Sequence, residues 1–415
     1  MADGPTSSIS AVSDGRLIAE TADRIAVPKV APADSFVLHA PLELLARAEL
    51  LEYVHAASRG RAVARVRWLG DKYDDAGEPV EEPAPLDARS IDEVARTLID
   101  ALAAGDLDDV DRAARRLGET ATPAELRRLV APSIVASLAA AAHGSILLWL
   151  LPRVSARHGV TSALLREPAR ELARHPDWRI RWFESAGEPT SQSLLEALLD
   201  VPMVGLPGSV FIYPIMNQAE ESGIAPKLLA GLTTEHIDVQ QTRRELSRVA
   251  AWSMLQEPPD YAPYGWSHCL TMPQAVMGIA GDSDGHGVRD GVDGRVAAAV
   301  AATHVVGFRA ALGQRALVPD YRPEPPSAGV FDEALANGPE TAAAFAFHRP
   351  GDGLDALVAD LASNAALHFD AHLVKYTLAC FDAAAADPTQ RRLYLAAAAS
   401  LAGWWAQQPS DGFFT

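Results

Sequence analysis

Three side chains that bind protons or metals follow one another near the C-terminal end of the sequence, in the stretch ALHFDAHLVKYTLACFDAAAA. His368, His372 and Lys375 are spaced i, i+4 and i+7, so a continuous helix would place them on one face. The residues around them are mostly apolar. Imidazole is a good ligand for iron, zinc and copper. The stretch therefore indicates either a solvated helix face or part of a buried metal site.

The other histidines support the second interpretation by their positions. The sequence has 12 histidines, and six of them lie in or beside apolar helical segments. These six are His39, His143, His268, His304, His368 and His372. A single histidine on an apolar face is usually a hydrogen-bonded core residue, but each buried imidazole needs its own partner. One shared metal ion would satisfy several of them at once.

Lys375 is informative because this chain uses arginine for almost every other positive charge. Only Lys29, Lys72, Lys227 and Lys375 are lysines among 36 basic residues. A buried lysine has a lowered pKa, and its neutral amine can act as a base or take up carbon dioxide as a carbamate, which arginine cannot do. The carbamate would be an anionic oxygen ligand. The alternative is that Lys375 extends from a half-buried helix to the surface.

Two further motifs do not support a metal site of their own. His368 and Asp370 match the H-x-D half of a two-histidine, one-carboxylate site, but on a helix residues i and i+2 diverge by about 200°. The loop from Asp282 to Asp293 resembles a calcium-binding loop, yet it ends in aspartate where a bidentate glutamate is needed. We expect a flexible acidic loop there. Nucleophile-elbow, phosphate-loop and dinucleotide-binding motifs are missing from the sequence.

The elements that would position these residues are helices. Apolar residues recur at intervals of three and four along most of the chain, and alternation typical of strands is rare. Ser90 with Glu93 forms a capping box, and Thr122 followed by Pro123 starts another helix. The stretch around Val210 is either a short strand or irregular. We predict an all-α protein with a single large multi-helix domain over residues 35–415, a buried central metal site, and a flexible N-terminal segment over residues 1–34.

Composition excludes several classes of partner. The chain has 415 residues, a net charge of −18 and 48% hydrophobic residues. The negative charge argues against nucleic acid and anionic membrane surfaces as partners. Two cysteines, Cys269 and Cys380, provide no disulfide framework, so a reducing cytoplasm is expected. We also find no signal peptide or membrane-spanning segment in the sequence pattern.

Four segments together resemble the questin oxidase-like family. They are HAPLELLARAELL, HGSILLWLLPRV, SHCLTMPQAVMG and DAHLVKYTLACFDAA, in this order along the chain. The resemblance spans roughly residues 35–405, and its most specific element is a histidine three residues before a lysine. It implies oxidative cleavage of anthraquinone-like polyketide rings at a non-haem iron site held by four histidines and a carbamylated lysine. The implied ligands are His39, His143, His268 or His304, His372 and Lys375, with His368 beside them acting on the substrate or a ligand.

The expected function is therefore an Fe(II)-dependent oxygenase that uses O2, with NADPH as a candidate external reductant. Its aromatic polyketide substrate would lie in a pocket lined by Trp149, Tyr264 and Trp266. The oligomeric state and the exact substrate are open. Two alternatives are a helical scaffold that binds partners without chemistry, and a zinc-dependent hydrolase with a histidine-rich helical site.

Overall fold

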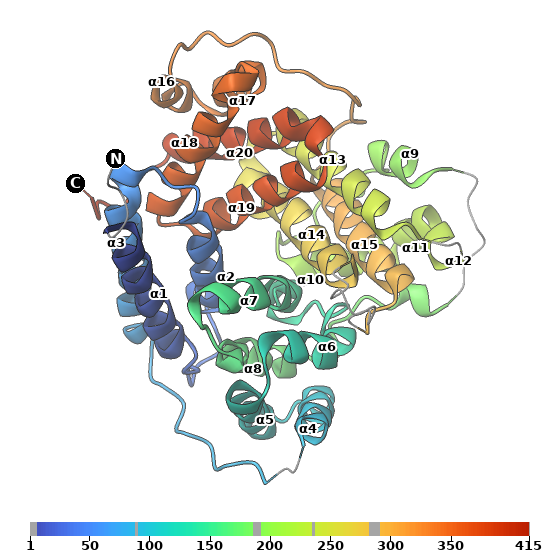
Figure 1. The fold of residues 1–415 in the computed structure, drawn as a ribbon. Helices are drawn as coiled ribbons and strands as arrows, with labels where there is room; N and C mark the ends of the chain where they lie inside the picture. The colour runs from blue at the N-terminus through green and yellow to red at the C-terminus, as the bar shows by residue number, and fades with distance from the viewer. Residues whose placement is uncertain (1–5, 88–89, 186–191, 235–236, 282–290, 415) are drawn as a thin grey trace. The chain divides into compact units, whose positions relative to one another are not determined.

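The all-α prediction is confirmed by the computed structural model (Figure 1). The structure describes residues 6–87, 90–185, 192–234, 237–281 and 291–414. Over these residues it contains 20 α-helices, several short 3-10 helices and one π-helix. Among the same residues, β structure is limited to two isolated bridges, Lys29 with Pro79 and Ser137 with Arg179.

The chain divides into two compact units. Unit 1 comprises residues 1–52 and 57–179, and unit 2 comprises residues 53–56 and 180–415. The prediction of one domain over residues 35–415 therefore differs from the structure. The boundary at residues 179–180 lies between the α-helices that end at Arg174 and begin at Leu194, and the sequence pattern did not mark it as a boundary between units.

Unit 1 is built from eight helices, and α2, α4, α5 and α6 each start with a side-chain N-cap. They are α1 (Thr6–Ile25), α2 (Ser35–Leu50), α3 (Ala56–Asp74), α4 (Ile91–Ala104), α5 (Leu107–Thr120), α6 (Pro123–Ile134), α7 (Gly144–His158) and α8 (Arg166–Arg174). Ser90 forms the capping box predicted for α4, and α6 begins after Thr122 as predicted, where Thr122 and Glu125 also form a capping box. The helices pack in pairs, α4 and α8 against α5, and α7 against both α2 and α6.

The N-terminal segment was expected to be flexible over residues 1–34, and this is wrong for α1. Ile18, Ala22 and Ile25 are buried and lie at i, i+4 and i+7. Arg59 of α3 also forms an ion pair with Asp14 at 2.9 Å. The apolar stripe of α1 is short and interrupted by serine, alanine and aspartate, which hid its helical period.

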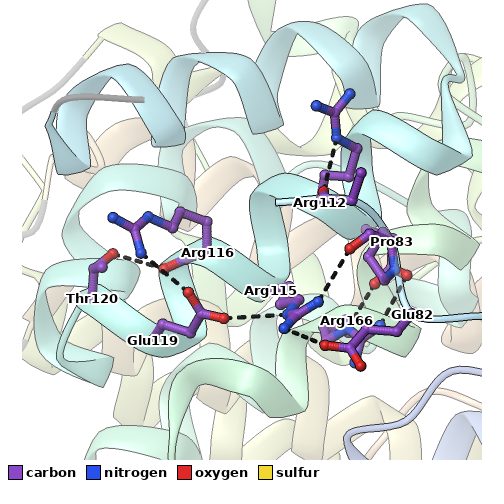
Figure 2. A network of polar contacts seen from close by, with 10 residues as sticks. Glu82, Pro83, Arg112, Arg115, Arg116, Glu119, Thr120 and Arg166 are labelled. Atoms are coloured by element: carbon purple, nitrogen blue, oxygen red, sulfur yellow. Dashed lines mark hydrogen bonds and ion pairs between the residues drawn. The ribbon is translucent and has the colours of Figure 1, made fainter. Parts of the chain in front are cut away.

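Arginines of α5 fasten the segment that precedes α4 (Figure 2). Arg115 pairs with Glu82 and donates to the carbonyl oxygen of Pro83 at 3.1 Å. One turn earlier, Arg112 donates to the carbonyl oxygen of Ala84 at 3.2 Å. This segment has no helix or strand of its own to pair its backbone carbonyls. The guanidinium groups of α5 supply the missing hydrogen-bond donors and hold the segment in place.

Unit 2 contains the remaining helices. They are α9 (Leu194–Leu199), α10 (Ile212–Glu221), α11 (Ile224–Leu229), α12 (Gly231–Thr234), α13 (Val239–Gln256), α14 (Ser267–Gly281), α15 (Gly294–Leu312), α16 (Phe331–Ala336), α17 (Pro339–His348), α18 (Leu354–Leu367), α19 (Ala371–Ala386) and α20 (Arg391–Ala406). Helix α14 packs against α13, α15 and α19, and α20 packs against α13, α17 and α19. The stretch around Val210 is irregular and leads into α10.

Helix α15 is a long and mostly buried helix of unit 2. It is long and apolar enough to span a membrane by length and composition alone, but 89% of that window is buried inside the protein. It is therefore weak evidence for a membrane span. Gly307 allows α10 to approach α15 closely, since a Cβ atom there would lie 2.6 Å from the sulfur of Met216.

Candidate metal-binding histidines

Unit 1 contributes two buried histidines whose rings meet edge to face. His39 lies in the second turn of α2, and His143 directly precedes α7. Their ring centroids are 4.5 Å apart at an interplanar angle of 68°. The Nδ1 atom of His39 lies 2.5 Å from the carbonyl oxygen of Ser35. Since a carbonyl only accepts hydrogen bonds, His39 carries its proton on Nδ1.

The backbone before His143 has an uncommon conformation. Ala140, Ala141 and Ala142 all have left-handed φ angles, of 49°, 50° and 57°. L-residues with a Cβ atom rarely adopt this region, and residues held there cluster at functional sites. The turn connects α6 to α7 and places His143 at the buried start of α7.

In unit 2, a π-helical turn positions His268. The π-helix Ala262–Trp266 runs directly into α14, of which His268 is the second residue. The Nδ1 atom of His268 donates to the carbonyl oxygen of Tyr264 at 2.7 Å. Trp266 is fully buried and donates from Nε1 to the carbonyl oxygen of Pro258 at 3.3 Å, which fixes the turn. Single-turn π-helices occur frequently at functional sites.

His372 faces His268 and is also the second residue of its helix. The ring centroids of the two histidines are 4.9 Å apart at 87°. Asp370 caps α19, and its Oδ1 accepts from the backbone amide of His372 at 2.7 Å and from Nδ1 of the same residue at 3.1 Å. The ring of Tyr264 meets His372 edge to face at 4.8 Å. A carboxylate–histidine pair of this kind is the common outer support of a metal ligand.

Three buried histidines thus share one arrangement. His39, His268 and His372 each bind an oxygen acceptor through Nδ1, which places the lone pair of each ring on Nε2. Each of the three offers one ring nitrogen as a metal ligand, and among the described residues the candidate ligand group includes neither His143 nor His304. The chain therefore has the residues for a possible three-histidine metal site.

Burial keeps the histidines of unit 2 neutral, which is the state that binds metals. Desolvation lowers the pKa of His268 well below its ordinary value, and the charges of His372 and Lys375 lower it further. Desolvation also lowers the pKa of His372, although the hydrogen bond to Asp370 opposes this in part. Burial raises the pKa of Asp370, but the hydrogen bond and charge of His372 outweigh it and the net shift is downward. Asp370 therefore stays ionised as a hydrogen-bond acceptor.

Lys375 lies one turn after His372 on α19 and is buried. Its charge acts on both His268 and His372, which places it with these two histidines in unit 2. The alternative in which Lys375 extends to the surface is therefore wrong, because the apolar flanks of α19 bury the whole side chain.

His304 was the alternative to His268 and lies in the middle of α15, fully buried. Desolvation lowers its pKa to about 4. Its charge acts on His268, so the two residues belong to one neighbourhood of unit 2. The absence of His304 from the candidate ligand group of the described residues favours His268 as the ligand.

The low pKa of His304 predicts a specific acid sensitivity. Between pH 6.5 and about 4 the unfolded chain binds a proton at His304 that the folded chain does not, so stability falls as the pH falls. The limiting slope is about 1.4 kcal/mol per pH unit. We expect the free energy of unfolding of His304→Gln, measured by urea denaturation in chelator-treated protein, to depend less steeply on pH over this window. Parallel profiles for the variant and the original protein would contradict the assignment.

His368 does not share a helix face with His372, which corrects the sequence prediction. It follows the last residue of α18, and α19 begins only at Ala371. Its Nδ1 atom accepts from the backbone amide of Asp370 at 3.0 Å, and its ring lies 4.9 Å from that of Trp405. The chain turns here because the side chain of Asp370 caps α19. His368 is therefore part of the turn that positions Asp370.

Asp370 is the residue that sequence reasoning missed. It was rejected as a metal ligand on the assumption of a continuous helix, and its actual role is to hold His372. The available signal was an aspartate two residues before a histidine at the start of a helix, which is an N-cap pattern. Of the three aromatic residues expected near the site, Tyr264 contacts His372 and Trp266 supports the π-helix, whereas Trp149 lies in unit 1 on α7. The acidic loop at Asp282–Asp290 lies outside the described residues.

Comparison with known proteins returned no match to a family model, a curated protein or a solved structure. The resemblance to the questin oxidase-like family accordingly stays a prediction that depends on the four quoted segments.

Proposed function

We propose that this chain is a metal-dependent enzyme whose ion is bound by Nε2 of His39, His268 and His372. The observation that carries the proposal is the arrangement these residues share: each is buried, and each is oriented by an acceptor at Nδ1. Structural core histidines need a partner for one nitrogen, but three of them with the same nitrogen engaged is the pattern of metal ligands.

The donor set restricts the choice of ion. Neutral imidazoles suit iron, zinc, copper and nickel, whereas calcium and magnesium prefer carboxylate and carbonyl oxygens. Asp370 supplies negative charge next to His372 without being a ligand itself. We further propose that Lys375 acts as a carbamate, because an anionic oxygen would offset the charge of a divalent ion bound by neutral rings. His143 would support His39 through their edge-to-face contact.

The reaction that we propose is O2-dependent oxidation of an aromatic polyketide of the anthraquinone type. A bound Fe(II) ion would supply electrons to O2. The chain would exclude water with its apolar helices, orient the ligand His372 through Asp370 and Tyr264, and accept a substrate proton at the amine or carbamate of Lys375. A dioxygenase places both oxygen atoms in the product, whereas a monooxygenase forms water and needs two electrons, for which NADPH is the proposed source.

A zinc-dependent hydrolase is the second candidate, and the all-imidazole donor set favours it. Three histidines with an open fourth position is a known form of catalytic zinc site, in which the metal lowers the pKa of its bound water. The two candidates share the ligands and differ in the metal and in the use of O2.

The test combines metal analysis with oxygen measurement. Protein purified without oxygen is expected to contain about one iron atom per chain by elemental analysis, and to consume O2 when an anthraquinone and NADPH are added. Iron retained without O2 uptake would reject the oxygenase. Stoichiometric zinc would support the hydrolase, and protein without metal after reconstitution with Fe(II), Co(II) and Zn(II) would reject both.

Cobalt provides a readout that does not depend on activity. Co(II) added to metal-free protein is expected to give visible absorption bands whose intensity reports the coordination number. His175→Ala is the matched control, because His175 is exposed in unit 1 and stacks on Trp178 at 3.8 Å. This variant should leave the cobalt spectrum unchanged.

A further inference from the structure

Unit 2 contains a cavity of about 410 Å³ that is lined by aromatic and charged residues, and none of them is a proposed metal ligand. It is formed by α13, α17, the start of α20 and the loop before α16, and these helices lie next to one another in Figure 1. Its volume is within the range of small-molecule sites. The residues that matter are three aromatic side chains, Trp252, Tyr321 and Phe347, and two arginines, Arg322 and Arg392.

The two arginines give this cavity its positive charge. Acidic residues outnumber basic ones by 54 to 36, and many arginines pair with carboxylates. Within the described part of the chain, neither Arg322 nor Arg392 forms an ion pair. Arg392 donates through Nη1 to the carbonyl oxygens of Phe347 and Arg349, which fixes its guanidinium at the cavity wall. The remaining donors of its planar fork suit a carboxylate.

The other polar residues of the cavity leave its charge positive. Asp320 is the one carboxylate in the lining, and His348 donates from Nε2 to the carbonyl oxygen of Pro323 at 2.8 Å. Two guanidinium groups therefore face one carboxylate. This excess of positive charge beside aromatic rings would attract an anion.

We propose that this cavity binds a small aromatic anion, such as an aromatic carboxylate. The ring of the ligand would stack among Trp252, Tyr321 and Phe347, and its negative group would lie against Arg322 and Arg392. The site is separate from the histidines of the proposed metal centre, so it does not depend on the proposed function. It would serve a second ligand of the protein, taken up by charge and aromatic stacking together.

Calorimetric titration of chelator-treated full-length protein tests the proposal with three probes. Benzoate is the aromatic anion, benzamide is its neutral isostere, and inorganic phosphate is an anion without a ring. We expect benzoate to bind at least 10-fold more tightly than either of the other probes. We also expect the affinity for benzoate to fall as the sodium chloride concentration is raised, because salt screens the charges of Arg322 and Arg392.

Two variants locate the binding. Arg322→Gln should weaken benzoate binding about 10-fold, and it should fold normally because this side chain is exposed and makes no hydrogen bond within the described residues. Arg315→Gln removes the same charge from the same loop, at a residue outside this cavity, and should change nothing. His372→Ala should also leave benzoate binding intact.

Four results would overturn the proposal. They are equal affinity for benzoate and benzamide, tighter binding of phosphate than of benzoate, equal weakening by Arg315→Gln and Arg322→Gln, and no binding of benzoate at millimolar concentration.

Discussion

Replacing His372 by alanine is expected to lower metal affinity by more than about 100-fold, because losing only the outer partner of a ligating histidine already costs 10- to 100-fold. The variant removes the proposed Nε2 ligand and leaves the half-buried Asp370 without its ring partner. Elemental analysis after purification without oxygen measures the loss, and the cobalt spectrum measures it independently. Circular dichroism should still show a helical protein, since α19 keeps the cap from Asp370.

Asp370→Asn separates ligation from helix capping. Asparagine caps helices as well as aspartate does, so α19 should remain stable while the charge behind His372 is lost. The expected loss of metal affinity is about 10- to 100-fold. Asp238→Asn is the matched control, because Asp238 caps α13 by the same geometry and accepts from Gln240 and Gln241. Full metal content in both His372→Ala and Asp370→Asn would remove this helix start from the site.

Breaking the buried ion pair between Arg309 and Glu257 is expected to cost about 3–5 kcal/mol of stability, because it leaves one charge buried alone. The two side chains are 1% and 0% exposed, and Nη1 of Arg309 lies 2.8 Å from Oε1 of Glu257. The second carboxylate oxygen accepts from the amide of Gln314, and Arg309 also donates to the carbonyl of Arg315 at 2.8 Å. The pair therefore joins the end of α15 to the segments around it.

Urea denaturation of Arg309→Met measures this effect. The matched control is Arg391→Met, which breaks the exposed pair with Asp355 and should cost less than about 1 kcal/mol. Replacing Arg309 and Glu257 together by apolar residues should recover much of the loss, since no unpaired charge then remains. A loss below about 1 kcal/mol in Arg309→Met would contradict the assignment.

The fold could be predicted where local chemistry decides it. The helix starts at Ser90 and Thr122 were predicted correctly, because a serine with a glutamate three residues later and a threonine followed by a proline favour a helix start wherever they occur. The helix α1 and the boundary at residues 179–180 were not predicted. Both depend on which distant residues come together, and a short apolar stripe such as Ile18 to Ile25 does not contain that information.

In the candidate site, too, the features set by neighbouring residues could be predicted and the others could not. Burial of His39, His268 and His372 followed from their apolar neighbours, and the structure bears it out. The position of His368 could not be predicted in this way, because the apolar sequence looks continuous and does not reveal the turn at Asp370 between α18 and α19. The acceptors at Nδ1 of His39 and His268 are backbone carbonyls, which every residue has, so no sequence pattern could have pointed to them.

The three left-handed alanines before His143 limit which fragments of unit 1 can keep their folded structure in isolation. The left-handed conformation costs an L-residue roughly 1–2 kcal/mol. Three such residues in succession therefore cost a conformational free energy comparable to the free energy of unfolding of a small domain. A free peptide with this sequence would not adopt the turn. The helices packed around α7 therefore hold His143 in its orientation. A fragment without these helices is expected to lose the left-handed turn and, with it, the position of the His143 ring.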